Sequence, residues 1–340
     1  MSCSMRLLLN DASQVAAARR SVGELAHSLG YDERDAGRVA LVLTEAATNV
    51  LKHAGHGELL VRVLHEPEQP AGAIEIVALD RGPGFDWARA SPDGYSTAGT
   101  LGGGLGAMHR VADACDVYSS PGAGTALRLL VQRAGAPAAA RHEFEWGAVC
   151  VPYPGELVSG DGWAVATAGD ELLAMVADGL GHGPQAHDAS TAATNCVGLQ
   201  PQPPKACLEQ VHAALRLTRG AAVACARLLP ASGRVEFAGI GNVSSLVLPP
   251  QGGGRQMVSL NGIVGHNVRR IQHFDYEWQE PALLLMHSDG LGTHWSLDRY
   301  PGLSVRHPTL VAAVLYRDFW RQRDDVTVLA VRRRAAGGAR

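Results

Sequence analysis

The first part of the chain, up to residue 132, combines two kinds of hydrophobic pattern. Apolar residues recur at helical spacing over residues 13–29, 33–53 and 105–113. Short apolar runs, typical of strands, occupy residues 58–65, 73–80, 115–119 and 125–131. This order of elements predicts an α+β domain, in which helices cover one face of a sheet.

The second part is richer in strands, which follow one another in hairpin-like succession. Strand-like runs lie at 146–151, 162–167, 171–177, 221–228, 233–239, 244–248, 282–287 and 326–332. Helical spacing occupies 184–198, 204–217 and 307–321. We therefore expect two stacked sheets flanked by helices.

An Ala/Pro/Gly-rich stretch without periodicity, "RAGAPAAARH", separates the two patterns. It predicts a linker over residues 133–142, with one domain at 1–132 and a second at 143–340. A chain of 340 residues is long for a single core, which also favours two domains.

The composition argues against some classes of binding partner. The formal net charge is −3 and no basic stripe stands out, so we expect neither nucleic acid nor a membrane surface as a partner. The longest apolar runs are far short of a membrane span, and no signal peptide is visible. The 6 cysteines are scattered without a CxxC pair, as expected of reduced thiols in a cytoplasmic protein.

Polar residues of the first domain form one candidate site. Glu45, Asn49 and His53 follow each other at a spacing of four, so they share one stripe of a helix. That stripe alone fits a solvated helix face equally well. Asp80 ends a strand and is followed by Gly82 and Gly84, and glycines there let a ligand approach the backbone.

A second glycine-rich stretch, "LGGGLGAMHR", leads into the next predicted helix, and free N–H groups at a helix start suit an anion. The later "GAGTAL" places Thr125 on a returning strand. The only lysines, Lys52 and Lys205, do not follow a glycine, which excludes a P-loop.

In this order the motifs resemble the GHKL (Bergerat) ATPase family, an α/β sandwich. The wording "DGYSTAGT…GGGLGAMHR" is similar to the small switch kinases of bacterial partner-switching and stressosome modules. The resemblance implies ATP with Mg²⁺: Asp80 receives the adenine amino group with Thr125 close by, Asn49 holds Mg²⁺, and Glu45 is the general base. It also implies that glycines shape the lid and the phosphate contacts, namely Gly82, Gly84, Gly102, Gly104 and Gly106.

The family's phosphate acceptor is a serine or threonine on a STAS-domain protein. Binding of ATP without phosphate transfer stays open. His53 is expected to be a structural partner rather than a catalyst.

Aspartates beside glycines recur in the second domain, at strand ends and in turns. They stand in "VSGDGWAV", "ADGLGHG", "HSDGLG" and "RDDVTVLAV". A single Asp-Gly is usually only a turn. Oxygen ligands that converge from several strand ends suit hard cations such as Mg²⁺ or Mn²⁺. Two such ions about 4 Å apart can activate a water for attack on a phosphate.

These motifs, in this order, resemble the SpoIIE-type branch of the type 2C metal-dependent protein phosphatases. The resemblance implies that two Mn²⁺ or Mg²⁺ ions are bound by Asp161, Asp178, Asp289, Asp324 and the carbonyl of Gly179. Asp178 and Asp289 are also the expected catalytic residues. Asp325 is expected to support the site, and Asn242 to be a structural residue near it.

Two details of the second domain stay open. The family's Gly-Asp-Trp/Tyr is Gly-Asp-Gly-Trp here, which leaves the role of Trp163 undecided but not that of Asp161. His182, in "ADGLGHG", fits either a general acid for the leaving oxygen or a hydrogen-bonded turn residue.

The two resemblances together predict a protein serine/threonine phosphatase with a fused ATP-binding, kinase-like domain. Its expected substrates are phosphorylated STAS-type regulatory proteins, and sigma-factor pathway regulators are further expected partners. Two alternatives remain: a kinase-dominant enzyme, and a non-catalytic, anti-sigma-like binding regulator.

Overall fold

The computed structural model describes residues 3–65, 68, 72–85, 102–136, 142–249 and 252–334. The chain divides into two compact units, residues 2–140 and 141–340. The predicted linker, residues 133–142, lies partly outside the described residues.

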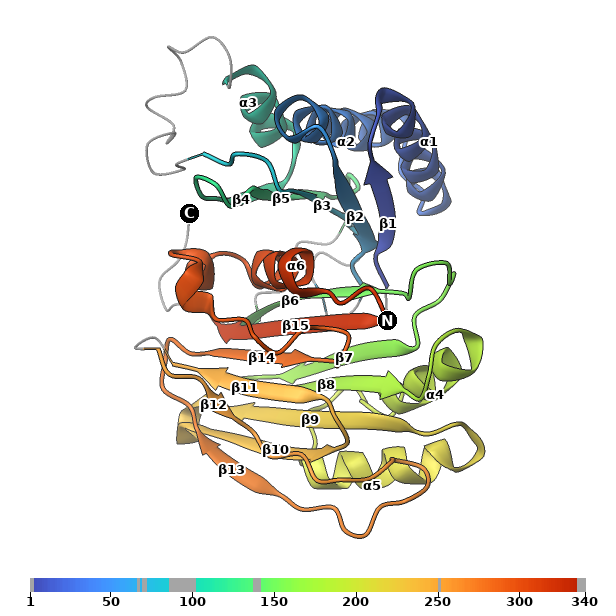
Figure 1. Cartoon of the computed structure of the whole chain (residues 1–340), viewed down its shortest axis with the longest axis vertical. Helices are drawn as coiled ribbons and strands as arrows, with labels where there is room; N and C mark the ends of the chain where they lie inside the picture. Colours follow the sequence, from blue (N-terminus) through green and yellow to red (C-terminus); the bar gives the residue numbers. More distant parts are fainter. Residues whose placement is uncertain are drawn as a thin grey trace. The chain divides into compact units, whose positions relative to one another are not determined.

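The N-terminal unit is an antiparallel sheet with three helices on one face (Figure 1). The strand order is β1-β2-β3-β5-β4. The elements are β1 Met5–Leu9, α1 Ala12–Ser28, α2 Glu33–Ala54, β2 Gly57–Val63, β3 Ile74–Asp80, α3 Gly102–Val111, β4 Ala114–Ser119 and β5 Thr125–Val131.

Local signals set the start and the end of α2. The Asp32 side chain accepts the N–H of Asp35 at 2.8 Å, which caps the N-terminus. Gly55, with φ of 77°, ends the helix. Buried apolar side chains such as Val42 and Leu43 pack in the core against the sheet, so the opposite stripe of α2 is free to carry polar groups.

The C-terminal unit contains two five-stranded antiparallel sheets. One has the order β13-β10-β9-β8-β7 and the other β12-β11-β14-β15-β6. The strands are β6 Phe144–Val151, β7 Asp161–Ala168, β8 Glu171–Gly179, β9 Ala221–Leu229, β10 Arg234–Ile240, β11 Ser244–Leu248, β12 Arg255–Gln256, β13 Phe274–Glu277, β14 Leu283–His287 and β15 Val326–Arg333.

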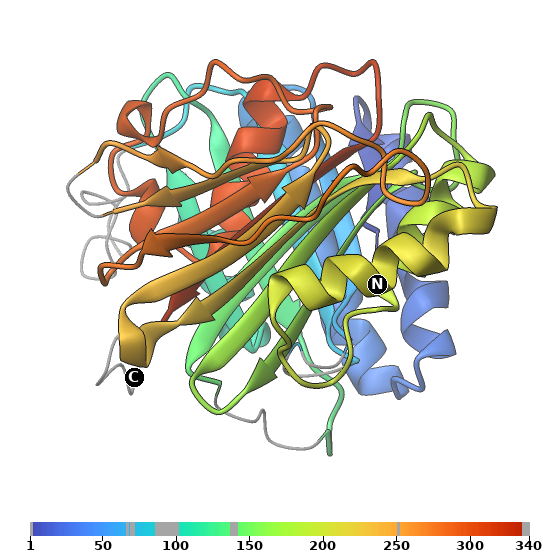
Figure 2. The same ribbon diagram turned by 90° about the horizontal axis from the view of Figure 1, so that it is seen from below.

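Helices cover the outer faces of both sheets (Figure 1 and Figure 2). The helices α4 Pro184–Thr194 and α5 Pro204–Ala214 pack on the first sheet, and α6 Pro308–Phe319 packs on β6 and β15 of the second. Short 3-10 helices, η4 Leu297–Arg299 and η5 Leu303–Val305, precede α6. The predicted fold class, an α/β unit followed by a sheet sandwich flanked by helices, is confirmed.

Three strands were not predicted from the sequence: β1, β12 and β13. All three lie at sheet edges and are only five, two and four residues long. Short edge strands bury little side-chain area, so their hydrophobic pattern is weak.

Candidate functional site

Four predicted aspartates come from strand ends in both sheets of the C-terminal unit. Asp161 begins β7 and Asp178 lies near the end of β8, and the strand register places these two residues opposite each other. Asp289 follows β14, and Asp324 precedes β15, the neighbour of β14. Each of the two sheets therefore contributes one pair of aspartates.

Ser288 joins the two pairs. Its hydroxyl donates to Asp161 Oδ2 at 2.6 Å and accepts the N–H of Thr327 at 2.9 Å. Ser288 and Asp161 are both buried. This bond connects the start of β7 in one sheet to β14 and β15 in the other, so the two sheet ends are fixed together at this point.

Asp178 is close enough to three other carboxylates to feel their charges. Burial, together with the negative charges of Asp289, Asp324 and Asp325, raises its pKa to about 8, although the backbone N–H of Asp289 donates to it and acts in the opposite direction. Burial and the charge of Asp178 raise the pKa of Asp161 well above its usual range. These side chains are therefore too close and too buried to carry all their charges unaided.

Asp324 and Asp325 differ in their surroundings. Burial raises the pKa of Asp324, which is half-buried, and the charge of Asp289 acts in the same direction. Asp325 is fully buried, and its Oδ1 accepts the N–H of Tyr153 at 2.8 Å. Asp325 thus holds the loop before β7, whereas Asp324 is nearer the solvent.

Glycine is required beside these aspartates because the backbones approach closely. A Cβ at Gly179 would collide with the carbonyl oxygen of Ala186 and lie 2.9 Å from that of Gly160. A Cβ at Gly290 would collide with the carbonyl oxygen of Asp325. The side chain of Asn242 donates to Asp289 Oδ2 at 2.5 Å, which orients that carboxylate.

The carboxylates fit divalent cations. Within the described part of the chain, no arginine or lysine forms an ion pair with Asp161, Asp178 or Asp324. Buried carboxylates without a basic partner need another source of positive charge. Carboxylate and carbonyl oxygens are the ligands of Mg²⁺ and Mn²⁺. Asp161, Asp178, Asp289 and Asp324 are therefore the residues that would hold such ions, with the Gly179 carbonyl.

A different group of acidic and histidine side chains meets the distances of a possible metal site among the described residues. That group is Glu236, His273 and Asp275, whose ligand atoms all lie within 4.8 Å of one another. Arg227 lies 3.5 Å from Glu236, and Arg234 lies 3.9 Å from Asp275. Because arginines already compensate this group, its charge does not call for a metal ion.

Another side chain, His182, stands beside the aspartates. Its Nδ1 lies 2.8 Å from Glu156 Oε1, and its ring stacks on Tyr153 with 4.6 Å between centroids. The sequence singled out His182 but gave no sign of Glu156, which is 26 residues away along the chain. Ser288 was also missed, because an isolated serine carries no pattern.

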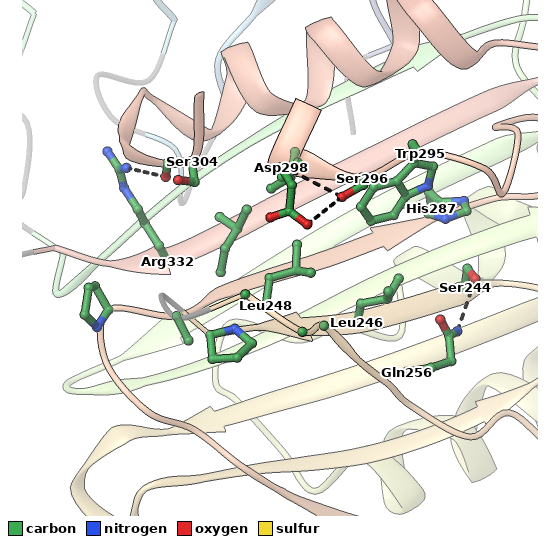
Figure 3. Close-up of a pocket in the computed structure, with 18 of the residues that line it drawn as sticks. Ser244, Leu246, Leu248, Gln256, His287, Trp295, Ser296, Asp298, Ser304 and Arg332 are labelled. Atoms are coloured by element: carbon green, nitrogen blue, oxygen red, sulfur yellow. Dashed lines mark hydrogen bonds between the residues drawn. The ribbon is translucent and has the colours of Figure 1, made fainter. Parts of the chain in front are cut away.

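A cavity in the C-terminal unit has a lining that contains none of these aspartates. It measures about 510 Å³, and β11 and β14 form its floor, with Trp295 and Asp298 opposite Leu246 (Figure 3). No predicted aspartate lines it. Its arginine, Arg332, is already paired with Glu145 at 2.6 Å. This cavity therefore does not have the composition of a phosphate-hydrolysing site.

The N-terminal unit has a smaller pocket of about 210 Å³ between α2 and the sheet. Asn49 and His53 of α2, Asp80 at the end of β3 and Thr125 at the start of β5 line it. Asp80 Oδ1 accepts the N–H of Gly82 at 2.8 Å and that of Thr125 at 3.2 Å. The pocket thus brings together four predicted nucleotide-binding residues, Asn49, Asp80, Gly84 and Thr125, with His53. Glu45, one helical turn before Asn49, is half-buried and does not line the pocket.

The predicted glycines have different surroundings. A Cβ at Gly82 would lie 2.8 Å from Ala54 Cβ, and one at Gly84, which has φ of +59°, would collide with the carbonyl oxygen of Ser120. Gly84 lines the pocket. Gly102, Gly104 and Gly106 belong to α3. The beginning of their motif, residues 93–101, lies outside the described residues.

A helix-covered sheet with a pocket lined by Asn49, Asp80 and Thr125, followed by a sheet sandwich with aspartates at the strand ends of both sheets, is the arrangement expected of an ATPase-type unit joined to a metal-dependent phosphatase. The family model "Histidine kinase-like ATPase domain" matches residues 8–131, and "Stage II sporulation protein E (SpoIIE)" matches residues 168–334.

Two curated relatives match the two halves. The serine/threonine-protein kinase RsbT of Bacillus subtilis (strain 168) is 31% identical over 117 residues, which are 34% of this chain and 86% of the kinase. The phosphoserine phosphatase RsbX of the same organism is 22% identical over 138 residues, which are 40% of this chain and 69% of the phosphatase. The chain therefore belongs to the RsbT family through its ATPase domain and carries a SpoIIE-type, PP2C-like phosphatase domain, a combination of partner-switching systems.

Two solved structures share the fold of part of this chain. A crystal structure of RsbX in complex with magnesium has a TM-score of 0.51 and 19% identity, covering 57% of this chain and 98% of RsbX, which shows the shared fold. A chain from a structure of the bacterial stressosome has a TM-score of 0.50 and 28% identity, covering 56% of this chain and 100% of its own length. Among the described residues, the helices are too short or too polar to cross a membrane.

Proposed function

We propose that the C-terminal unit hydrolyses phosphoserine or phosphothreonine in a protein, using two Mn²⁺ or Mg²⁺ ions. The observation that carries this proposal is that Asp161 and Asp178 lie opposite each other on β7 and β8. The backbone N–H of Asp289 donates to Asp178, and among the described residues neither Asp161 nor Asp178 has a basic partner. The proposed ligands are Asp161, Asp178, Asp289, Asp324 and the Gly179 carbonyl.

The ions would supply positive charge to the phosphate and lower the pKa of a water molecule. The chain's own residues set the geometry. Ser288 holds the carboxylate of Asp161, and Asn242 holds that of Asp289. Asp325 fixes the loop before β7 through the N–H of Tyr153. Positioning of this kind is the main contribution a protein makes to phosphate chemistry.

For the substrate we propose a STAS-domain regulatory protein, in the cytoplasm. Support comes from the similarity to RsbT, RsbX and a stressosome chain, because these are proteins of partner-switching modules. The fusion of a kinase-like and a phosphatase unit fits a partner that alternates between a phosphorylated and an unphosphorylated state. Sigma-factor pathway regulators are the further proposed partners.

The N-terminal unit is proposed to bind ATP with Mg²⁺. Asp80 would receive the adenine amino group beside Thr125, Asn49 would hold Mg²⁺, and Glu45 would act as the general base if phosphate is transferred. Support comes from the pocket that Asn49, Asp80 and Thr125 line together. The second candidate function, protein kinase activity, is favoured by this pocket and by the match to RsbT.

Hydrolysis of p-nitrophenyl phosphate by the full chain tests the phosphatase proposal. Turnover is expected with Mn²⁺, and a chelator and Asp178→Ala are each expected to abolish it. Asp170→Ala, at an exposed turn of the same unit, is the matched control and is expected to leave turnover intact. Absence of turnover in the presence of Mn²⁺, or turnover that survives Asp178→Ala, would refute the proposal.

Transfer of radiolabelled phosphate from ATP to candidate STAS proteins tests the kinase proposal. Wild type should label the partner, and Glu45→Ala should not. Label that is unaffected by Glu45→Ala would refute the base assignment. A chain that binds ATP without labelling any partner would instead be a nucleotide-dependent binding regulator.

A further inference from the structure

Three leucines of the C-terminal unit expose their side chains to solvent beside the proposed phosphatase site. Leu157 is 97% exposed, Leu217 is 101% exposed and Leu180 is 40% exposed. A single exposed leucine is common on protein surfaces and needs no explanation. Several exposed leucines that gather around a functional site are instead typical of a surface that contacts another protein.

The three leucines lie on neighbouring loops at one end of a sheet. Leu157 precedes β7, Leu180 follows β8 and Leu217 precedes β9. These strands are antiparallel neighbours, so the start of β7, the end of β8 and the start of β9 share one end of the sheet. Asp161 and Asp178 lie at the same end. The leucines therefore border the proposed metal ligands.

Contacts between the loops hold this surface in place. The loop before β7 is attached through Glu156, whose Oε1 lies 2.8 Å from His182 Nδ1 in the turn after β8. That turn is attached in its own right, because the N–H of Leu180 donates to the carbonyl oxygen of Gly220 at 3.1 Å, in the loop before β9. The three loops are thus joined to one another, and a partner that binds them has less backbone to order.

One guanidinium stands beside the leucines without a carboxylate partner. Arg219 is exposed, and its Nη1 lies 3.2 Å from where a Cβ of Gly181 would stand. Arg219 is therefore next to the turn that follows Asp178. Across the described ranges, no acidic side chain forms an ion pair with Arg219. Its charge is available to an acidic group of a partner.

The substrate is the partner that must reach this end of the sheet. A phosphorylated serine or threonine can enter the site only if its main chain crosses the surrounding loops. Because consecutive residues are about 3.8 Å apart along the chain, the residues on either side of the phosphorylated one meet these loops as well. Apolar side chains of that segment would cover the leucines, and an acidic side chain would pair with Arg219.

We propose that Leu157, Leu180, Leu217 and Arg219 form a docking surface for the substrate segment that carries the phosphoserine or phosphothreonine. The surface selects a segment with bulky apolar residues and an acidic residue next to the phosphorylated one. This inference rests on the proposed phosphatase function and names the kind of sequence that the phosphatase accepts. The docking residues act on substrate binding, and no bond that forms or breaks in the reaction involves them.

Two phosphoserine peptides test the docking surface. The first has a leucine on each side of the phosphoserine and an aspartate beside one leucine, and the second has glycines in place of the leucines. With the full chain and Mn²⁺, kcat/KM for the leucine peptide is expected to exceed that for the glycine peptide about 10-fold, because burial of one leucine side chain can supply a factor of this size. Equal values for the two peptides would overturn the proposal.

A double variant, Leu157→Ser with Leu217→Ser, tests the same surface from the side of the protein. Both side chains are almost fully exposed, so thermal unfolding should match that of wild type. We expect KM for the leucine peptide to rise about 10-fold, while kcat/KM for the glycine peptide and for p-nitrophenyl phosphate stays within about 2-fold of wild type. An unchanged KM, or an equal loss on p-nitrophenyl phosphate, would overturn the docking role.

The matched control is Leu199→Ser. Leu199 is 90% exposed and lies in the connection between α4 and α5. The helix α4 begins beside the turn after β8 and is 11 residues long, so its far end lies about 16 Å from that turn. Leu199→Ser should therefore behave as wild type on all three substrates. A rise in KM equal to that of the double variant would contradict the location of the surface.

Replacement of Arg219 by glutamine tests the charged part of the surface. Arg219→Gln is expected to lower kcat/KM for the leucine peptide about 3-fold, as for an exposed ion pair, and to leave a peptide with asparagine in place of the aspartate unchanged. An equal loss on both peptides would remove Arg219 from the docking surface.

Failure of the docking surface and failure of the phosphatase proposal give different results. Wild type that hydrolyses neither the peptides nor p-nitrophenyl phosphate would overturn the proposed phosphatase function. Hydrolysis of all three substrates without preference for the leucine peptide would overturn the docking surface alone.

Discussion

Replacement of Asp178 by asparagine should stabilise the metal-free protein while it removes the response to metal. Asp178 has a pKa of about 8 in the folded chain, compared with 3.8 for an ordinary aspartate. At pH 7 the unfolded carboxyl is ionised and the folded one is mostly protonated. Holding that proton costs up to about 4 kcal/mol of folding free energy at pH 7. Asparagine is neutral in both states and avoids the cost.

The sign of the pH dependence follows from the raised pKa. The stability of metal-free wild type should fall as pH rises from about 4 to about 8, and Asp178→Asn should lack this contribution. We expect a gain of about 1 to 4 kcal/mol at pH 7, because neighbouring carboxylates share the repulsion. For a unit of this size that corresponds to a rise in Tm of several degrees, at about 2 to 4 °C per kcal/mol.

Tryptophan fluorescence during thermal unfolding is a suitable assay, because Trp146, Trp163, Trp278, Trp295 and Trp320, five of the 6 tryptophans, lie in the C-terminal unit. In the presence of Mn²⁺, wild type should become more stable than Asp178→Asn. Wild type gains about 2.7 kcal/mol when Mn²⁺ is at 100 times its Kd, and the variant should gain far less.

Asp170→Asn serves as the control and should change neither the stability of the metal-free protein nor its stabilisation by Mn²⁺. A metal-free Asp178→Asn protein that is less stable than wild type, or one that keeps the full response to Mn²⁺, would refute the carboxylate repulsion on which this prediction is based.

Three further predictions concern other positions. Glu75, buried between Arg62 and Arg128, has a pKa lowered to about 2 because the two arginines outweigh the raising effect of burial. Calorimetry should show that Glu75→Gln lowers the free energy of unfolding by about 3 kcal/mol at pH 7. This difference from wild type should disappear as pH falls from 4.5 towards 2, and a difference that stays constant with pH would contradict the prediction. Thr125→Val should weaken ATP binding about 10-fold in an equilibrium titration, and unchanged affinity would remove Thr125 from the nucleotide site. Gly179→Ala should cost about 1 to 3 kcal/mol in chemical denaturation because of the backbone collision, and a neutral effect would contradict the close packing.

The fold was largely predictable because the main strands and helices have strong hydrophobic periods. The continuous apolar runs along β8 and β9 reflect strands that are almost wholly buried. The edge strands β1, β12 and β13 lack such a signal, since one side of each is unpaired.

Candidate site residues were predictable where they form a motif. Asp161, Asp178, Asp289 and Asp324 each stand beside glycine or another aspartate at a strand end, so the sequence showed them although it could not show which sheet ends meet. Glu156 has no comparable pattern. Its relation to His182 depends on the folding of the loop before β7 over the turn after β8. Contacts of this kind are set by tertiary structure alone.

Release of inorganic phosphate from a phosphoserine peptide by the full chain, with Mn²⁺ as the only added metal, is the most direct measurement of the proposed activity. Wild type should release phosphate, and Asp289→Asn, which removes one proposed ligand beside Asn242, should lower the rate at least about 100-fold. The exposed control Asp298→Asn should retain the wild-type rate. Phosphate release that is independent of Mn²⁺, or equal in wild type and Asp289→Asn, would contradict a metal-dependent phosphatase at these aspartates.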